Sequence, residues 1–162
     1  FKLLVAKVNT FIRENLPKGT FFAGTFGILD FSTDTMYYIN CGIPALLVYT
    51  RAYNNVIEVQ GEGHILGFVK DVAPYIKVKK VKLSEGDIVM IVTDGIIDTK
   101  SLRGDIFGKT RTQNALMENS GYPAEKMAKF TYDALVEFTS KELENDITML
   151  VMKYLGNQAA QA

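Results

Sequence analysis

The sequence predicts an α+β domain in which antiparallel strands and helices form layers. Short apolar runs separated by turn residues fill most of residues 20–95 and are typical of consecutive antiparallel strands. Two segments with helical spacing of apolar residues follow, and a last apolar run comes after them. Because the strands form one series instead of alternating with helices, a layered α+β arrangement is favoured over a βαβ one.

The chain opens with a predicted amphipathic helix over residues 2–15. Its apolar residues recur at helical spacing, and Pro17 and Gly19 follow as a stop signal. The residues at helical spacing that define its apolar face are Leu4, Val8, Phe11 and Ile12. Strands are then expected at residues 20–29, 36–40, 45–50 and 56–59, followed by a glycine-bearing loop at 60–67.

Residues 75–83 are predicted to form a lysine-rich strand. Its apolar residues change pleat face partway along the segment, which predicts a bulge at Lys79 and Lys80. The four lysines of this strand stand at positions 77, 79, 80 and 82. They are typical of an exposed sheet edge, and a phosphate-attracting stripe is the alternative.

The segment from Glu85 to Gly95 is expected to be the centre of the fold. Gly86 and Asp87 form a turn, and residues 88–92 are a run of apolar, mostly β-branched side chains. A run that is apolar on both pleat faces is typical of a strand covered on both sides. The run is followed by Asp94 and by a glycine that lets other groups approach closely.

The last third of the chain is expected to hold two helices and a final strand. A short helix is predicted over residues 110–119 and a longer one over 124–141, with Pro123 beside its first turn. The longer helix is expected to bury a stripe of Met127, Phe130, Ala134, Leu135 and Phe138. A buried strand follows at 147–154, and residues 156–162 are predicted to be a flexible tail.

Composition argues against several classes of function. The 18 basic and 18 acidic residues give zero net charge, which disfavours nucleic-acid binding. With one cysteine and one histidine, an internal disulfide is excluded, and a zinc site or a serine triad is disfavoured. No apolar run is long enough to cross a bilayer and no signal peptide opens the sequence, so a cytoplasmic domain without membrane insertion is expected.

Polar residues beside two core strands form the candidate site. Asp94 follows one strand, and Asn145 and Asp146 come just before the last one. Two such strands can bring these oxygens together at one rim of a sheet. Oxygen donors without histidine or cysteine suit Mg²⁺ or Mn²⁺, and paired cations of this kind activate water for attack on phosphorus.

Other polar residues are expected to have local roles. Asp30 is interpreted as a hairpin-turn residue, and Asp98 as a solvated turn residue. His64 is interpreted as a loop residue, with catalytic acid–base chemistry as the alternative. Asn40 and Gly42 are expected to shape a tight corner instead of touching a substrate.

Six short motifs follow one another along the chain. They are Thr25-Phe26-Gly27-Ile28-Leu29-Asp30, Tyr38-Ile39-Asn40-Cys41-Gly42-Ile43-Pro44, Leu66-Gly67, Leu83-Ser84-Glu85-Gly86-Asp87, Thr93-Asp94-Gly95 and Asn145-Asp146-Ile147-Thr148. In this order they resemble the metal-dependent protein phosphatases of the 2C type, in the bacterial sporulation- and stress-response branch of serine phosphatases. The resemblance runs from about residue 3 to about residue 154.

The resemblance implies an antiparallel β-sandwich flanked by helices, over residues 1–155. It also implies two divalent cations, Mn²⁺ or Mg²⁺, at one end of the domain, and hydrolysis of phosphoserine or phosphothreonine by metal-bound water. Asp94 occupies the position of a metal ligand in the family, and the candidate metal-binding residues are Asp94, Gly95, Asn145 and Asp146. The implied partner is a phosphoprotein substrate or a regulatory protein in bacterial signalling.

Three features depart from the family's pattern. An early glycine–aspartate pair, whose aspartate bridges both cations, has no counterpart, so the natural protein is expected to extend beyond Phe1 and the sandwich to lack its N-terminal strands here. Asn145 replaces the first aspartate of the closing Asp-Asp-x-Thr motif. Asp146 is not expected to substitute for it, because neighbours in extended chain point in opposite directions. Ile43 replaces a histidine of the family.

Two functions therefore stay open. The first is a metal-dependent serine/threonine phosphatase domain, inactive in this chain alone because the bridging aspartate is missing. The second is an impaired pseudophosphatase that acts as a regulatory or binding module, favoured by the charge lost at Asn145. The ordered motifs argue against a third class, a small-molecule-binding sandwich unrelated to phosphatases. An open sheet edge would allow pairing with a second copy, so a homodimer is a further expectation.

Overall fold

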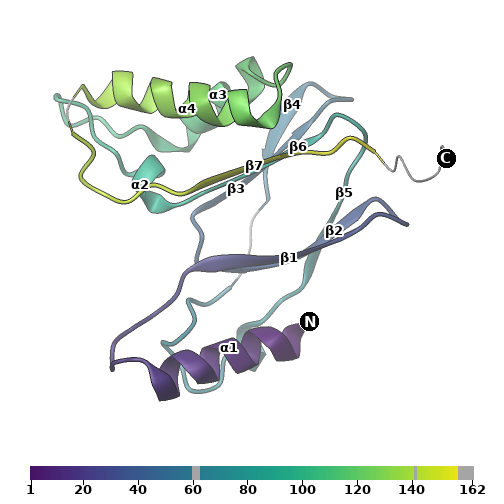
Figure 1. The fold of residues 1–162 in the computed structure, drawn as a ribbon, viewed down its shortest axis with the longest axis vertical. Helices are drawn as coiled ribbons and strands as arrows, with labels where there is room; N and C mark the ends of the chain where they lie inside the picture. Colours follow the sequence, from purple (N-terminus) through teal and green to yellow (C-terminus); the bar gives the residue numbers. More distant parts are fainter. Residues whose placement is uncertain (60–62, 141, 157–162) are drawn as a thin grey trace. The chain divides into compact units, whose positions relative to one another are not determined.

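A computed structural model describes residues 1–59, 63–140 and 142–156. The chain divides into a first unit, Phe1–Ile43 with Gln60–Lys82, and a second unit, Pro44–Val59 with Leu83–Ala162. Each unit contains one antiparallel sheet together with helices (Figure 1). The predicted α+β class, with antiparallel sheets and helices, is therefore confirmed.

The first unit is a helix packed on a three-stranded sheet. Its elements are α1 (Lys2–Asn15), β1 (Gly24–Asp30), β2 (Thr35–Cys41), the short 3₁₀ helix η1 (Ala73–Tyr75) and β5 (Lys79–Lys82). The strands are antiparallel in the order β1-β2-β5. The buried cluster joins Val5 and Ile12 of α1 to Ile39 and Cys41 of β2. Burial raises the pKa of the Cys41 thiol to about 11, so this cysteine is an inert core residue.

Helix α1 has the predicted bounds, but only part of its predicted apolar face is buried, with Ile12 in the core and Val8 packed against it. The residues it buries are Val5, Asn9 and Ile12, whereas Leu4 and Phe11 are exposed. The reason is Asn9, whose side-chain amide donates to the carbonyl of Val69 at 3.1 Å and accepts from the backbone N–H of Gly67 at 2.7 Å. A buried amide is tolerated when it is hydrogen-bonded, so long-range partners decide which side of the helix faces inward.

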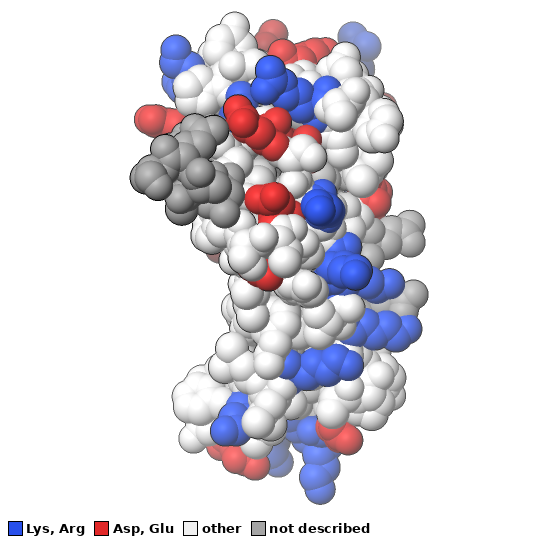
Figure 2. All heavy atoms as spheres, turned by 90° about the vertical axis from the view of Figure 1, so that its right-hand side faces the viewer, with Lys and Arg blue, Asp and Glu red and all other residues white. Residues whose placement is uncertain are grey.

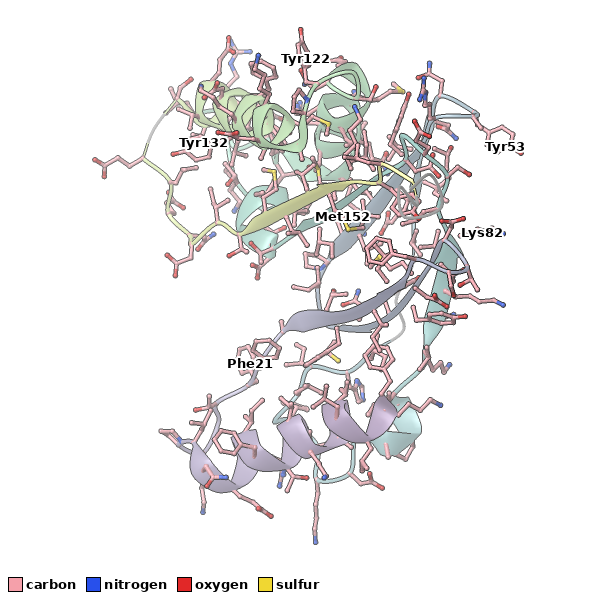
Figure 3. All side chains as sticks on the ribbon, turned by 45° about the vertical axis from the view of Figure 1, so that its right-hand side comes forward. Phe21, Tyr53, Lys82, Tyr122, Tyr132 and Met152 are labelled. Carbon is pink, nitrogen blue, oxygen red and sulfur yellow. The ribbon has the colours of Figure 1, made fainter. Side chains whose placement is uncertain are left out.

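The lysine-rich strand is shorter than predicted and has no bulge. It begins only at Lys79, and its register with β2 is continuous from Tyr38 opposite Lys79 to Thr35 opposite Lys82. The predicted bulge at Lys79 and Lys80 is therefore wrong, because the change of pleat face falls before the strand starts. In the described residues β5 is an edge of its sheet, as the lysines predicted. Lys82 lies at this outer edge (Figure 3). Several basic side chains gather on the face of the molecule that Figure 2 shows.

Two tight connections in the first unit follow the local interpretation of their residues. The Asp30 carboxylate accepts hydrogen bonds from the hydroxyls of Ser32 and Thr33 and from the Ser32 backbone N–H, and these bonds lower its pKa. Asn40 donates to the Ile43 carbonyl and accepts from the Ile43 N–H, both at 2.8 Å. Gly42 between them has φ +95, which favours glycine. These residues shape a turn and a corner, as expected.

The second unit is a four-stranded antiparallel sheet with helices. Its elements are β3 (Ala45–Thr50), β4 (Asn55–Glu58), β6 (Ile88–Val92), α2 (Asp94–Ile97), α3 (Gly108–Glu118), α4 (Ala124–Thr139) and β7 (Met149–Lys153). The strand order is β4-β3-β6-β7, so β6 lies inside the sheet as predicted. Helices α3 and α4 lie on one face of the sheet (Figure 1), where Leu116, Met127 and Leu135 join Leu47 and Met90 in the core.

The buried stripe of α4 differs from the predicted one. Met127 and Leu135 are buried, but Phe130 and Phe138 are only half-buried and Ala134 is exposed. The remaining buried positions are held by Thr131, whose hydroxyl donates to the Met127 carbonyl, and by Thr139, whose hydroxyl donates to the Lys100 carbonyl. Both hydroxyls are satisfied by carbonyl oxygens, which removes the cost of burying them.

The turn before β6 is held by a buried carboxylate. Asp87 is 4% exposed, and its two oxygens accept from the backbone N–H groups of Arg51 and Ser84, each at 2.8 Å. The backbone of the same turn is bonded to Tyr154, just after β7. These contacts fix the start of β6 relative to β3 and β7.

Three of the predicted segments lie partly outside the residues that the structure describes. Residues outside the described ranges are the first three of the predicted loop at 60–67, the last of the predicted helix 124–141, and all but the first of the predicted tail 156–162. The predicted strand over 20–29 is the seven-residue β1 preceded by a single bridge between Phe22 and Leu66. Within the described ranges, none of the helices has the length and hydrophobicity that crossing a membrane would require.

Candidate functional site

The candidate site begins where β6 and β7 end their pairing. Val92 opposite Met149 is the last pair of the ladder, and the Thr93 N–H then donates to the Thr148 carbonyl at 3.1 Å. The hydroxyl of Thr93 accepts from the Thr148 N–H at 3.0 Å. The side chain of Thr93 therefore extends the connection between the two strands by one more residue and holds the following segments together.

Asp94 is the exposed first residue of the short helix α2. The three residues that follow it, Gly95, Ile96 and Ile97, are buried, and Ile96 belongs to the core cluster. One carboxylate oxygen of Asp94 accepts from the Gly95 N–H at 2.9 Å. The chain forms one helical turn here, and its buried apolar residues fix the position of Asp94.

Gly95 is where the two segments touch. A β-carbon built on it would stand 2.1 Å from the carbonyl oxygen of Asp146 and 3.6 Å from the β-carbon of Asn145. This is the close approach that the glycine after Asp94 predicted. The Gly95 carbonyl accepts from the Thr99 hydroxyl at 2.5 Å, so one of its two lone pairs is already used.

The structure brings together Asp94, Gly95, Asn145 and Asp146 at one rim of the second unit. Asn145 and Asp146 are exposed and precede β7, which starts only at Met149, and the chain bends at Asn145. The argument from alternation in an extended strand therefore does not apply to this pair. Asp98, at the end of α2, is an exposed turn residue as expected.

The donors at this rim fit a hard divalent cation in kind but not in number. They are carboxylate, amide and carbonyl oxygens, which suit Mg²⁺ or Mn²⁺. In the part of the chain that the structure describes, however, no group of three or more His, Cys, Asp or Glu side chains lies close enough to hold a metal ion. Two divalent cations need more negative charge than Asp94 and Asp146 supply.

The other residues weighed as candidates lie in the first unit. His64 is exposed, its ring lies 4.2 Å from that of Tyr75, and it has no carboxylate partner within the described residues. In the second unit, the hydroxyls of Thr93 and Thr99 have structural roles that were not predicted from the sequence. The role of Thr93 could have been predicted from its place next to Asp94, because Thr148 stands at a similar place near Asp146, just before the paired strand.

Comparison with known proteins identifies the family of this fold. The family model for stage II sporulation protein E matches residues 2–155. The phosphoserine phosphatase RsbU of Bacillus subtilis is 20% identical over 150 residues, which are 93% of this chain and 44% of RsbU.

Two solved structures share the fold. The SiaA PP2C domain of Pseudomonas aeruginosa superposes with a TM-score of 0.79 at 19% identity, covering 93% of this chain and 58% of that one. The SpoIIE phosphatase domain of Bacillus subtilis, presoaked with Mn, gives 0.65 at 15% identity, covering 94% and 65%. This chain thus spans less than two thirds of each of these relatives. It belongs to the stage II sporulation protein E family and has the fold of PP2C phosphatase domains.

Proposed function

We propose that this chain is the greater part of a metal-dependent serine/threonine phosphatase domain that acts on a phosphoprotein in bacterial signalling. Membership of the stage II sporulation protein E family supports the reaction class. The observation that supports the assignment of the site is the close approach of Gly95, the residue after Asp94, to the Asp146 carbonyl and to Asn145.

Asp94 is the best-placed ligand at this rim. Its backbone is held by the buried strand β6 on one side and by buried Ile96 on the other, so its position is rigid. It is exposed, and one carboxylate oxygen is engaged by the Gly95 N–H. The second oxygen has no hydrogen-bond partner within the described residues, which leaves it available to a cation.

The other proposed donors are Asn145, Asp146 and the remaining lone pair of the Gly95 carbonyl. When bound, a pair of Mn²⁺ or Mg²⁺ ions neutralises phosphoryl charge and activates water for attack on phosphorus. The residues of this chain position the ions at the rim, and at least one further carboxylate is required to complete their ligation. We propose that this carboxylate comes from chain outside the described residues.

An impaired domain that serves as a regulatory or binding module is the second candidate, and Asn145 favours it. An amide oxygen can coordinate a cation but carries no charge, so the site loses attraction for a dication at this position. Losses in the outer shell of a metal site already reduce affinity or activity by about 10- to 100-fold. A regulatory protein would then be the partner in place of a phosphoprotein substrate.

Phosphatase assays on the full natural protein that contains this chain test the two candidates. The substrates are p-nitrophenyl phosphate and a phosphoserine peptide, each with Mn²⁺, with Mg²⁺ and with EDTA. Cation-dependent turnover that falls by at least about 100-fold in Asp94→Asn supports the phosphatase. The control is Glu125→Gln, because Glu125 lies in the first turn of α4 and outside the rim.

The outcomes separate the candidates. Turnover that is independent of the cation, or unchanged in Asp94→Asn, contradicts the phosphatase proposal. Absence of turnover together with tight binding of a signalling protein favours the regulatory module. We further propose a cytoplasmic location, and sedimentation of the purified chain decides whether it forms a homodimer.

A further inference from the structure

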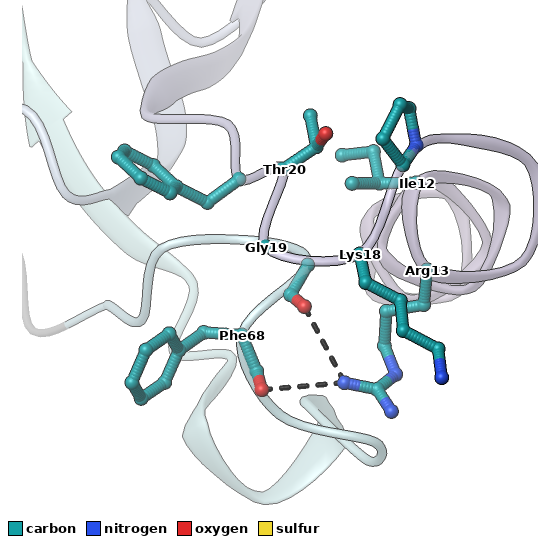
Figure 4. Close-up of a pocket in the computed structure, with 9 residues that line it drawn as sticks. Ile12, Arg13, Lys18, Gly19, Thr20 and Phe68 are labelled. Carbon is teal, nitrogen blue, oxygen red and sulfur yellow. Dashed lines mark hydrogen bonds between the residues drawn. The ribbon is translucent and has the colours of Figure 1, made fainter.

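A pocket in the first unit is lined by none of the residues of the Asp94 rim. It opens beside the C-terminal end of α1, with a volume of about 530 Å³. Its walls come from the end of the helix, the turn at residues 17–21, and the segment of Gly67 and Phe68 (Figure 4). This volume lies within the range of pockets that hold small organic ligands.

The charged side chains of the pocket are both basic. Arg13 and Lys18 line it, and none of the lining residues that the structure describes is acidic. Arg13 donates through one nitrogen to the carbonyls of Gly67 and Phe68, at 3.4 and 3.2 Å, as Figure 4 shows. These bonds hold the guanidinium at the pocket and leave further N–H groups for a ligand. Lys18 has no hydrogen bond or ion pair within the described ranges.

The apolar part of the pocket is unusually accessible. Ile12 is almost fully buried and forms part of its wall, whereas Phe21 is 62% exposed and Phe68 is 76% exposed. A single exposed aromatic ring is ordinary on a protein surface. Here two exposed aromatic rings and two basic side chains line the same pocket. A ligand with an apolar body and an anionic group could contact the rings with the first and the basic side chains with the second. The hydrogen bonds of Arg13 explain why the loop is held to α1, but they explain neither Lys18 nor the two phenylalanines.

The charge at this place suits one negative charge better than two. The C-terminal end of α1 carries a partial negative charge that opposes an anion. Arg13 in the last turn offsets this, and Lys18 adds one further positive charge. A carboxylate therefore fits better than a doubly charged phosphate.

We propose that this pocket binds a small organic carboxylate with an aromatic body. The carboxylate lies between Arg13 and Lys18, and the ring lies against Phe21 and Phe68. The site lies entirely in the first unit and goes beyond the proposed phosphatase function. Its test needs no divalent cation, so its failure would leave that function untouched.

Titration of the 162-residue chain followed by amide NMR tests the site. N-acetyl-phenylalanine is the probe, and N-acetyl-phenylalanine amide, which has no charge, is its neutral control. The acid is expected to saturate shifts at residues 17–21 and 67–68, and the amide to bind at least about tenfold more weakly. Equal binding of the two compounds, or shifts elsewhere in the chain, would overturn the proposal.

Variants and a peptide sharpen the test. Lys18→Gln is expected to weaken binding of the acid at least about threefold, and Lys7→Gln, an exposed position of α1 outside the pocket, is expected to leave it unchanged. Equal effects of the two substitutions would overturn the role of Lys18. A tripeptide that ends in phenylalanine with a free carboxylate distinguishes the ligand's source. If it binds much more tightly than the acid, the small-molecule assignment is wrong and a partner's C-terminus is the ligand.

Discussion

The carbonyl oxygen of Asp146 lies so close to Gly95 that a β-carbon on Gly95 would stand 2.1 Å from it. Gly95 lies within the helical turn α2, so its requirement for glycine comes from this neighbour and not from a left-handed backbone. The obstacle is backbone, which cannot rotate away as a flexible side chain can. The contact therefore fixes the distance between the segment that carries Asp94 and the segment that carries Asn145.

Gly95→Ala is expected to destabilise the domain by about 1–3 kcal/mol, because the new methyl group forces the two segments apart. The measurement is the urea midpoint of unfolding followed by circular dichroism. Gly121→Ala is the matched control, since nothing lies within 4 Å of its added β-carbon. A Gly95→Ala variant as stable as the Gly121→Ala variant would show that the segments do not touch.

Asn145→Asp is expected to raise the affinity for Mn²⁺ at least about tenfold, because it restores a charged ligand at the rim. Calorimetric titration of both proteins measures this change. Asn114→Asp adds the same charge at an exposed position of α3 and controls for the general effect of charge. If Asn114→Asp raises the affinity as much as Asn145→Asp does, the account of the defect at position 145 is wrong.

Asn9→Leu is expected to destabilise the first unit by about 1–3 kcal/mol, because it leaves the Gly67 N–H and the Val69 carbonyl without their partner. Asn15→Leu makes the same change at an exposed position of the same helix and removes only a local bond to Phe11. Thermal unfolding compares the two variants. Equal stabilities would contradict a structural role for the buried amide.

The pH dependence of Asp30 follows from its hydrogen bonds. The hydroxyl of Ser32, and then that of Thr33, lower the pKa of Asp30 below 3.8. Because the folded pKa is the lower one, the stabilisation is present above the unfolded pKa and is lost as the pH falls through the folded pKa. Carboxyl NMR titration is expected to give a pKa below 3.8, and Ser32→Ala is expected to raise it. An unchanged pKa in Ser32→Ala would refute this cause.

The positions of helices and strands were easier to predict from the sequence than the side chains they bury, as α1 and β5 show. The bounds of α1 follow from local spacing and from Pro17, but its inward face depends on acceptors more than fifty residues away, which bond Asn9. In β5 the apolar residues before Lys79 were assigned to the strand, although Ile76 is buried just after η1. Local periodicity cannot tell a strand from the segment leading into it.

The location of the candidate site was predicted from the sequence more completely than the buried faces of the helices. A buried strand before Asp94 and another strand after Asp146 were recognisable as apolar runs, and their pairing puts both motifs at one rim. The helical turn at Asp94 was not predicted, because an aspartate–glycine pair is a common turn signal. Its formation depends on the burial of Ile96 and Ile97 in the core, which is a tertiary effect.

Paramagnetic broadening of amide NMR signals by low concentrations of Mn²⁺ tests the central claim, that the Asp94 rim binds divalent cations. The account predicts broadening centred on residues 93–96 and 145–148, lost in Asp94→Asn and kept in Glu125→Gln. Broadening centred elsewhere, or a pattern that Asp94→Asn leaves unchanged, would contradict it.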